Sequence, residues 1–323
     1  MPEITYIQAI SDGLREEMRR DDSVFLIGED IGEYGGAFKV TEGFLDEFGE
    51  ERVIDTPIAE TAILGMSIGA ALQGLRPVAE MQFSDFVANG FNQLVNNAAK
   101  IHYRWGGHVP MVVRMPTGGG IHGGPFHSQN TEAWFFHVPG LKLVAPSTPY
   151  DAKGLIKAAI RDENPVLYFE HKYLYRREKG EVPEGDYEVE IGKGRIAREG
   201  KDITVLTYGS MVSASLEAVE NLKGDIDVEV IDLRTLIPLD MELIIESIKK
   251  TNKVLIVHED VRTGGIGAEL SARITEEAFE WLDGPIRRIA SIDTPVPFAP
   301  SLEEYFMPNP EKIADGIQQL WNY

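Results

Sequence analysis

The polar and apolar positions of the chain follow two alternating patterns over most of its length. Apolar residues that return every three or four positions predict amphipathic helices, and the first covers residues 5–20. Short runs that are apolar on both faces predict buried strands between these helices. In the first half of the chain we expect strands at 24–28, 52–54, 76–81, 110–114, 142–145 and 165–169, and further helices after residue 56, over 83–103 and over 151–161.

A second series of the same kind follows a change of character at about residues 175–200. Residues 176–186 are charged and contain Gly180, Pro183 and Gly185, which is typical of a linker or a surface excursion. After this segment the pattern predicts strands at 203–208, 228–232, 254–258 and 286–292, and helices near 212–222, 239–250 and 266–281.

Buried strands that alternate with helices indicate mostly parallel sheets that are covered by helices on both faces. The predicted fold class is therefore α/β, with two doubly wound domains. We expect the first domain over residues 1–185, a linker over 186–200 and the second domain over 201–323.

A single carboxylate, that of Glu60, stands at the start of an unusually apolar predicted helix. Pro57 suits the first helical position and Thr56 the cap, and a capping box would then place its acid at position 59. Glu60 comes one residue too late for that box. Since burying a charged carboxylate is costly, Glu60 is a candidate for proton transfer. The alternative is a first-turn acid that only complements the helix dipole.

Composition and charge exclude several classes of protein. The 323 residues include 31 Lys+Arg and 52 Asp+Glu, and the net charge of −21 argues against nucleic acid as a general partner. Because there is no cysteine, disulfides, zinc–thiolate sites, iron–sulfur clusters and a cysteine nucleophile are excluded. The first residues do not resemble a signal peptide and no run of 18 apolar residues occurs, so we expect a cytoplasmic protein without a membrane span.

A glycine-rich loop follows the strand expected at 110–114. Its glycines at 118, 120 and 123 match a dinucleotide fingerprint, but no helix is expected directly after them and no acid ends a strand about 20 residues on. A nicotinamide-dependent oxidoreductase is therefore only an alternative reading. The same loop carries His122 and His127, either as functional groups or as loop donors satisfied by the backbone.

Several short motifs occur together and in order along the whole chain. They are Gly28-Glu29-Asp30, the segment from Asp55 to Glu60, Gln82-Phe83, His127-Ser128-Gln129 and the segment from Tyr150 to Gly154. In this combination the sequence resembles the beta subunit of the decarboxylating first component of 2-oxo acid dehydrogenase complexes. That family consists of transketolase-like enzymes that use thiamine diphosphate, with a pyrimidine-binding domain followed by a C-terminal domain.

The resemblance implies a role for particular residues. Glu60 is expected to bond N1′ of the cofactor's aminopyrimidine, where a shared proton favours the imino tautomer. Gln82, Phe86 and the backbone near Ile58 are expected around the pyrimidine, although several relatives have Tyr where this chain has Phe86. His127 matches the family's catalytic histidine, which assists transfer of the acyl group to a lipoyl group.

The resemblance also implies metal ions and partner proteins. Met111, Ala159, Ile160, Asp162 and Asn164 match a structural potassium site; from the residues alone, Asp162 and Asn164 could equally belong to an ordinary turn. The chain has no Gly-Asp-Gly motif for Mg²⁺, so an alpha subunit is expected to hold Mg²⁺ and the diphosphate in an α2β2 heterotetramer. The isolated chain is then expected to be inactive. A lipoyl acyltransferase component is expected to dock on the complex.

The substrate is less clearly indicated than the family. Residues 126–133 resemble the branched-chain type most closely, so branched-chain 2-oxo acids are the expected substrates. Pyruvate and acetoin have relatives of the same shape and stay alternatives. A non-enzymatic assembly protein is a further alternative of another class.

Overall fold

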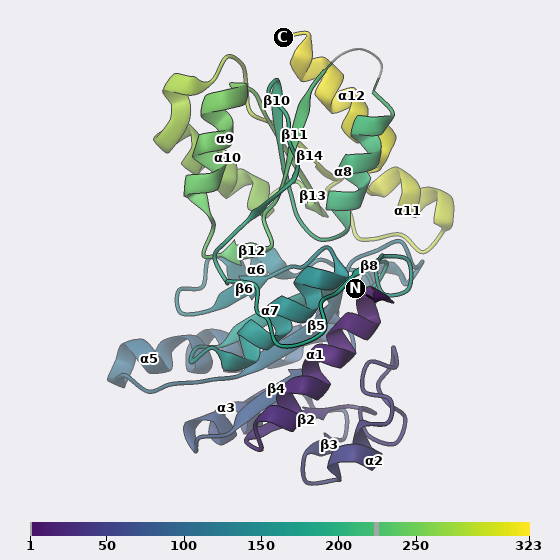
Figure 1. Cartoon of the computed structure of the whole chain (residues 1–323), viewed down its shortest axis with the longest axis vertical. Helices are drawn as coiled ribbons and strands as arrows, with labels where there is room; N and C mark the ends of the chain where they lie inside the picture. The colour runs from purple at the N-terminus through teal and green to yellow at the C-terminus, as the bar shows by residue number, and fades with distance from the viewer. Residues whose placement is uncertain (1, 223–225) are drawn as a thin grey trace. The chain divides into compact units, whose positions relative to one another are not determined.

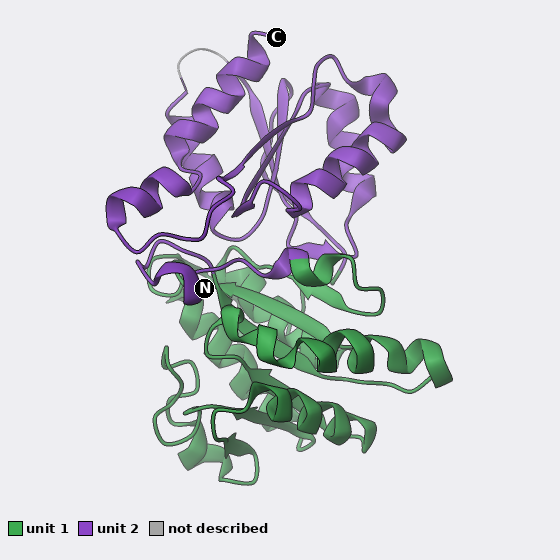
Figure 2. Cartoon of the chain, turned by 180° about the vertical axis from the view of Figure 1, so that it is seen from behind, with its two compact units in different colours: residues 1–117, 134–191 green, residues 118–133, 192–323 purple. Residues whose placement is uncertain are grey.

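The structure, a computed structural model, describes residues 2–222 and 226–323 (Figure 1). The chain divides into two compact units, which are coloured green and purple in Figure 2. Unit 1 comprises Met1–Thr117 and Trp134–Ile191, and unit 2 comprises Gly118–Ala133 and Gly192–Tyr323. Within the described ranges, no helix is both long and apolar enough to cross a membrane.

Unit 1 is built on a parallel sheet, whose strands are apolar on both faces because helices cover them. Its strands lie in the order β6-β7-β5-β4-β2-β3, and every neighbouring pair is parallel. Their bounds are Val24–Gly28 for β2, Val53–Asp55 for β3, Arg76–Glu80 for β4, Val112–Thr117 for β5, Lys142–Val144 for β6 and Val166–His171 for β7. A separate antiparallel pair joins β1 (Glu3–Thr5) and β8 (Lys179–Glu181).

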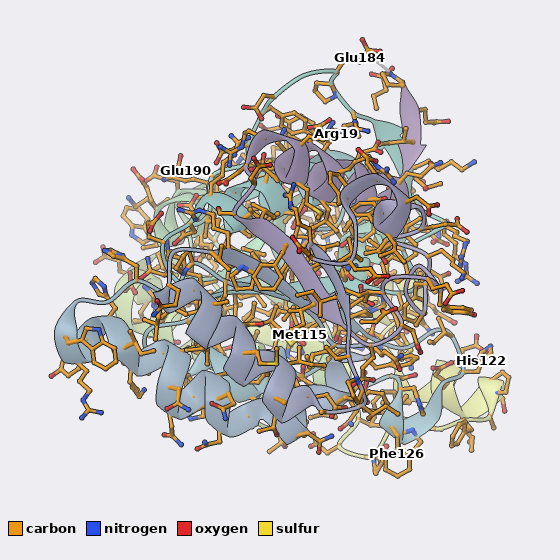
Figure 3. All side chains as sticks on the ribbon, turned by 90° about the horizontal axis from the view of Figure 1, so that it is seen from below. Arg19, Met115, His122, Phe126, Glu184 and Glu190 are labelled. Atoms are coloured by element: carbon orange, nitrogen blue, oxygen red, sulfur yellow. The ribbon has the colours of Figure 1, made fainter. Side chains whose placement is uncertain are left out.

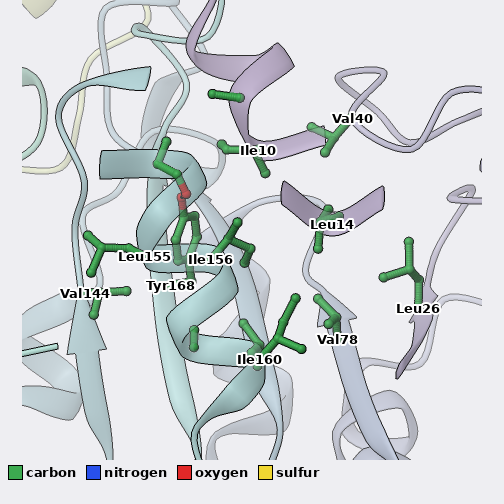
Figure 4. Close-up of a cluster of buried hydrophobic side chains, with 14 of the residues drawn as sticks. Ile10, Leu14, Leu26, Val40, Val78, Val144, Leu155, Ile156, Ile160 and Tyr168 are labelled. Carbon is green, nitrogen blue, oxygen red and sulfur yellow. The ribbon is translucent and has the colours of Figure 1, made fainter. Parts of the chain in front are cut away.

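The helices of unit 1 include the amphipathic helix expected at the start of the chain. This helix, α1 (Tyr6–Arg20), begins with a capping box between Thr5 and Gln8. Figure 4 shows its buried face, with Ile10 and Leu14, packed beside Ile156 of α7 (Pro149–Arg161). The other helical segments are α2 (Phe44–Phe48), α3 (Glu60–Leu72), η1 (Ser84–Phe86), α4 (Val87–Asn92), η2 (Gln93–Ala98), α5 (Ala99–Trp105) and α6 (Glu132–Phe136), of which the first two residues of α6 are assigned to unit 2.

The helix expected over residues 83–103 is present but is not regular. It runs from η1, a 3-10 turn, through α4 and the π-helical turn η2 to the end of α5. Side-chain amides in the π-helical region bond along the helix, as Asn97 Nδ2 does to Gln93 Oε1 at 2.7 Å. Insertions of this kind change which side chains face the core over one turn.

Unit 2 contains a second sheet with the strand order β14-β13-β10-β11-β9. The first four strands are parallel, and β9 is antiparallel to β11. The strands are β9 (Arg195–Arg198), β10 (Ile203–Thr207), β11 (Val228–Asp232), β13 (Val254–Val261) and β14 (Arg287–Ser291), and β12 (Thr235–Ile237) lies outside this sheet. The helical segments are η3 (Gly124–Phe126), α8 (Ser210–Glu220), α9 (Met241–Thr251), α10 (Ile266–Ala278), η4 (Phe279–Trp281), α11 (Pro300–Phe306) and α12 (Pro310–Trp321).

The predicted fold class, two α/β domains with mostly parallel sheets, is confirmed. The division of the chain differs from the expected one in two places. Residues 118–133 group with unit 2 rather than with the first domain, and residues 195–198 of the expected linker form the edge strand β9. The pattern also gave no sign of α11 or α12, although α12 packs Ile313, Ile317 and Leu320 into the core of unit 2.

Candidate functional site

The candidate residues of unit 1 follow three neighbouring strands at the same edge of the sheet. Glu29 comes directly after β2, Glu60 lies five residues after the end of β3, and Gln82 lies two residues after β4. The three strands are adjacent and parallel in the order β4-β2-β3. Because the carboxyl ends of parallel strands meet at one edge, the topology gathers these side chains there, which is where α/β sheets bind ligands.

Glu60 is the first residue of α3, and the cap predicted at Thr56 is wrong. The helix begins three residues later than expected, with Ala59 as its N-cap. The cause lies in the preceding strand, because the backbone N–H of Thr56 donates to the carbonyl of Gly28 at 2.9 Å and prolongs the extended pairing of β3 with β2. Glu60 therefore stands in the positive field of the helix N-terminus, which stabilises a negative charge there.

The carboxyl group of Glu60 is buried, as the apolar pattern around it predicted. Only 6% of the residue is exposed. Asn89 Nδ2 donates to its Oε2 at 3.2 Å. The carboxyl group thus has one neutral side-chain donor and stands at a helix N-terminus.

A second buried carboxyl group, that of Glu29, interacts electrostatically with Glu60. Burial and the charge of Glu60 raise the pKa of Glu29, and a hydrogen bond from the backbone of Ala59 opposes this rise. Glu29 Oε1 is buried and has no hydrogen-bond partner in the parts of the chain that the structure describes. In the sequence, Glu29 stood out only as part of the motif Gly28-Glu29-Asp30. Its spacing from Glu60 gave no sign that the two carboxyl groups would lie together.

The other residues expected around a pyrimidine take different positions at this edge. Gln82 Nε2 donates to Asp30 Oδ2 at 3.2 Å, so that the strand ends of β2 and β4 are joined through their side chains. The ring of Phe86 packs edge-to-face on Phe83, with ring centres 5.6 Å apart. Ile58 is 84% exposed.

A buried ion network supports this edge from within the sheet. Arg114 of β5 is 1% exposed and forms ion pairs with Glu80 of β4 and Glu170 of β7. The hydroxyl of Tyr175 donates to Glu170 Oε1 at 2.9 Å. The network thus connects β4, β5 and β7. Gln82 follows β4, and the glycine-rich loop follows β5.

Two of the residues expected to bind potassium, Ile160 and Asp162, contact cationic side chains of the chain itself. Arg76 Nη1 donates to the carbonyl of Ile160 at 2.9 Å and to that of Asp162 at 3.2 Å. The carbonyl of Met111 accepts the N–H of Val166 at 3.0 Å. The carboxylate of Asp162 pairs with Lys142 and accepts the N–H of Asn164 at 2.8 Å. Since a carbonyl oxygen has two lone pairs, these bonds leave room for a further ligand, and the potassium site, Ala159 included, stays a prediction.

The histidine loop, residues 118–133, is held within unit 2 by buried acids. Glu259 Oε1 accepts the N–H of Gly119 at 2.7 Å and Nδ2 of Asn130 at 3.0 Å. Ser210 Oγ donates to the other oxygen of Glu259 at 2.9 Å. Glu303 of α11 accepts the N–H of Gly120 at 3.0 Å. These bonds fix both ends of the loop that carries His122 and His127.

The loop does not have the geometry of a dinucleotide site. A dinucleotide fingerprint needs free backbone N–H groups in front of a helix. Here the N–H groups of Gly119 and Gly120 are bonded to the carboxylates of Glu259 and Glu303, and only the single 3-10 turn η3 follows. The nicotinamide-dependent alternative loses its only sequence support. His127 lies half-buried directly after η3.

Glu132, near the end of the loop, makes the stability of the folded chain depend on pH. It is almost fully buried and accepts a hydrogen bond from the hydroxyl of Tyr208 at 2.7 Å. Burial, together with the charge of Asp260, raises the pKa of Glu132 well above its usual range. The folded chain therefore binds a proton here that the unfolded chain has released at neutral pH.

We expect the free energy of unfolding to fall as the pH rises from about 5 to 8, because the raised pKa of Glu132 makes the folded state the stronger proton binder over that range. Glu132→Gln should weaken this dependence, since glutamine does not titrate. Urea unfolding of the chain and the variant at both ends of the range measures it. Identical pH slopes for the two proteins would contradict the assignment.

Two family models match the chain over most of its length. Residues 2–178 match the transketolase pyrimidine-binding domain, and residues 192–313 match the transketolase C-terminal domain. The chain is also 54% identical to the 2-oxoisovalerate dehydrogenase subunit beta of Bacillus subtilis (strain 168), over 99% of both chains. The chain belongs to the family of 2-oxo acid dehydrogenase beta subunits. The resemblance that the sequence motifs indicated is thereby confirmed.

Other beta subunits of the family are similar over the same extent. The pyruvate dehydrogenase E1 component subunit beta of Staurastrum punctulatum is 49% identical, over 100% of this chain and 99% of its own. Among solved structures, a split-gene transketolase described as an inactive beta4 tetramer has a TM-score of 0.79 at 23% identity, and covers 99% of this chain and 98% of its own. That likeness bears on the fold. Beta subunits named for different substrates are thus similar in sequence to nearly the whole of this chain.

Proposed function

We propose that the protein is the beta subunit of a thiamine diphosphate-dependent 2-oxo acid dehydrogenase. It decarboxylates a branched-chain 2-oxo acid and transfers the acyl group to a lipoyl group, together with an alpha subunit. The observation that carries this proposal is the burial of Glu60 at the start of α3. Its charge contributes to the raised pKa of a second buried carboxyl group, that of Glu29. Membership of the beta-subunit family supports it.

The residues at the edge of unit 1 fit the pyrimidine half of the cofactor. The carboxyl group of Glu60 can hold a proton at N1′, and the buried, unpartnered Oε1 of Glu29 is a polar atom that a bound group would satisfy. Phe86 offers an aromatic surface and Gln82 an amide to a flat heterocycle. When bound, thiamine diphosphate supplies the carbon that adds to the 2-oxo group and the sink for the electrons released with CO₂.

The alpha subunit is part of the proposal because this chain offers only half of a thiamine site. It has no Gly-Asp-Gly motif with which to hold Mg²⁺ and a diphosphate. The helix α3 is apolar around most of its circumference and exposes Met66 (56%) and Leu72, and Ile58 lies just before it. A helix of this kind is typical of one that packs against another protein. We infer an α2β2 assembly in the cytoplasm, which binds Mg²⁺ through the alpha subunit.

His127 and the acidic surface complete the proposed reaction. The imidazole of His127 is placed on a loop whose ends are fixed, as a residue that handles a proton during acyl transfer requires. The net charge of −21 suits a basic docking domain on a lipoyl acyltransferase component.

Co-expression with an alpha chain that carries Gly-Asp-Gly tests the proposal. We expect a stable complex that binds thiamine diphosphate, and no decarboxylation by either chain alone. The complex should prefer 3-methyl-2-oxobutanoate to pyruvate by about tenfold or more in kcat/KM, because each added methyl group contributes about 1–3 kcal/mol in an apolar pocket. Steady-state rates with both acids and with acetoin measure this preference.

Two outcomes would count against the proposal in different ways. Decarboxylation by the isolated beta chain at the rate of the complex would contradict the divided site. A preference for pyruvate or acetoin would leave the family reaction in place and move the substrate to one of the alternatives.

A further inference from the structure

His122 and Glu303 form a pair in unit 2 that the family roles leave unused. Glu303 lies on α11, 181 positions from His122 along the chain, and only 2% of it is exposed. Its carboxylate accepts three hydrogen bonds from the histidine loop: from Gly120 N at 3.0 Å, from His122 N at 3.3 Å and from His122 Nδ1 at 2.6 Å. The last bond orients the imidazole.

The bond to Glu303 decides which ring nitrogen of His122 is available. When Nδ1–H donates to the carboxylate, Nε2 is left as the nitrogen that takes up or releases a proton. Nε2 has no hydrogen-bond partner within residues 2–222 and 226–323, and 53% of the side chain is exposed. An imidazole that is oriented by a buried carboxylate and open on its other side is the arrangement of a general acid–base pair.

The backbone at His122 adopts a conformation that is strained for a residue other than glycine. Its φ is +59°, in the left-handed region that favours glycine. The loop is otherwise rich in glycine here, from Gly118 to Gly120 and again at Gly123 and Gly124. Non-glycine residues in this region persist where the surrounding structure holds them, and such positions cluster at functional sites. The carboxylate of Glu303 supplies that restraint.

Several side chains close in sequence to His122 and Glu303 are apolar and exposed. Figure 3 labels His122 and Phe126 on the same outer side of the molecule. Phe126 is 66% exposed, and the ring of Phe298 lies so close to Gly124 that an added Cβ would stand 2.5 Å from it. Ile121, Leu302 and Tyr305 are exposed as well. Apolar side chains of this kind suit an uncharged hydrocarbon chain.

We propose that His122, oriented by Glu303, is a second acid–base residue for acyl transfer to the lipoyl disulfide. This inference rests on the proposed function. In the reaction the S–S bond breaks, one sulfur bonds to the acyl carbon, and the other leaves as a thiolate that takes a proton from His122 Nε2. The two electrons that reduce the disulfide come from the decarboxylated 2-oxo acid, and solvent returns the proton to the imidazole. Glu303 is a positioning residue, and His127 acts on the same transfer from its own place on the loop.

The test uses His122→Gly in the reconstituted alpha–beta complex. Glycine adopts φ +59° without strain and keeps the backbone bond to Glu303, so that the variant removes the imidazole and little else. Two rates are measured, namely decarboxylation with an artificial electron-accepting dye and acylation of a purified lipoyl domain. We expect the first to fall less than threefold and the second to fall about 10²-fold.

Added imidazole separates acid–base chemistry from a purely structural role. Because the side chain of His122 is more than half exposed, free imidazole can enter the space that it leaves and bond to Glu303. We expect millimolar imidazole to raise the rate of acylation by the His122→Gly complex at least about fivefold. This increase would restore part of the rate that is lost with the imidazole side chain. The rescue should disappear in the double variant His122→Gly, Glu303→Gln, which lacks the orienting carboxylate.

The controls give each outcome one meaning. The exposed His137 of unit 1 changed to Gly should alter neither rate by more than twofold, and imidazole should not accelerate its complex. His122→Gln serves as a second variant if the glycine variant does not assemble. Acylation within threefold of the parent, or a loss that imidazole does not restore, would overturn the proposal. A parent complex that does not decarboxylate 2-oxo acids would instead overturn the proposed function.

Discussion

Glu60→Gln should lower the decarboxylation rate of the reconstituted alpha–beta complex by roughly 10³-fold. Glutamine fills the same space and can still accept the hydrogen bond from Asn89 Nδ2. It cannot share a proton with N1′ of an aminopyrimidine, which is the role proposed for the carboxyl group. Dye-linked decarboxylation at saturating thiamine diphosphate measures the loss directly.

The same substitution should not unfold the chain. The buried carboxyl groups of Glu29 and Glu60 repel each other when both are charged, so a neutral side chain at position 60 removes an unfavourable interaction. The melting temperature of the variant should therefore equal or exceed that of the parent. Glu33→Gln, at an exposed position of the same sheet edge, is the matched control and should retain full activity. An active Glu60→Gln complex would favour a non-enzymatic assembly role.

Arg114→Met should destabilise the chain by about 3–5 kcal/mol, because it leaves the buried carboxylates of Glu80 and Glu170 without their cation. The loss should be greater at pH 8 than at pH 6, because burial raises the pKa of Glu170, and this acid escapes its unpaired charge when it takes up a proton at lower pH. Urea unfolding followed by circular dichroism measures both values.

The matched control for Arg114 is an ion pair in solvent. Arg273 and Glu277 pair across one turn of α10 at 3.2 Å, with both side chains more than a third exposed. Arg273→Met should therefore cost less than about 1 kcal/mol. Equal effects of the two substitutions would show that burial of the Arg114 network contributes nothing to stability.

The local pattern predicted the parts of the fold that depend on local sequence. The fully apolar strands and the stripe of α1 follow from their spacing, and the apolar sequence after Glu60 predicted that its carboxyl group would be buried. The start of α3 was misplaced because the local rules for caps do not include the hydrogen bond from Thr56 to Gly28. That bond depends on how two strands pair.

The parts of the site that the sequence did not predict are those that depend on contacts between residues distant in sequence. Glu303 lies 181 residues from His122, on a helix that the pattern did not indicate. Glu29 and Glu60 meet only because β2 and β3 are neighbours in the sheet. Arg114 falls within an otherwise apolar strand, and only the presence of Glu80 and Glu170 on the two adjacent strands explains it. A search for isolated charges inside apolar strands would have found Arg114.

The carboxylates of Glu259 and Glu303 act on the histidine loop as a bound anion acts on a phosphate loop. They occupy the N–H groups of Gly119 and Gly120 with oxygen atoms that belong to the chain itself. These hydrogen bonds form when the chain folds and do not require a bound ligand. Since the entropy of ordering a loop otherwise opposes association, an acyl-accepting arm that reaches this loop meets a preformed surface and binds without that loss.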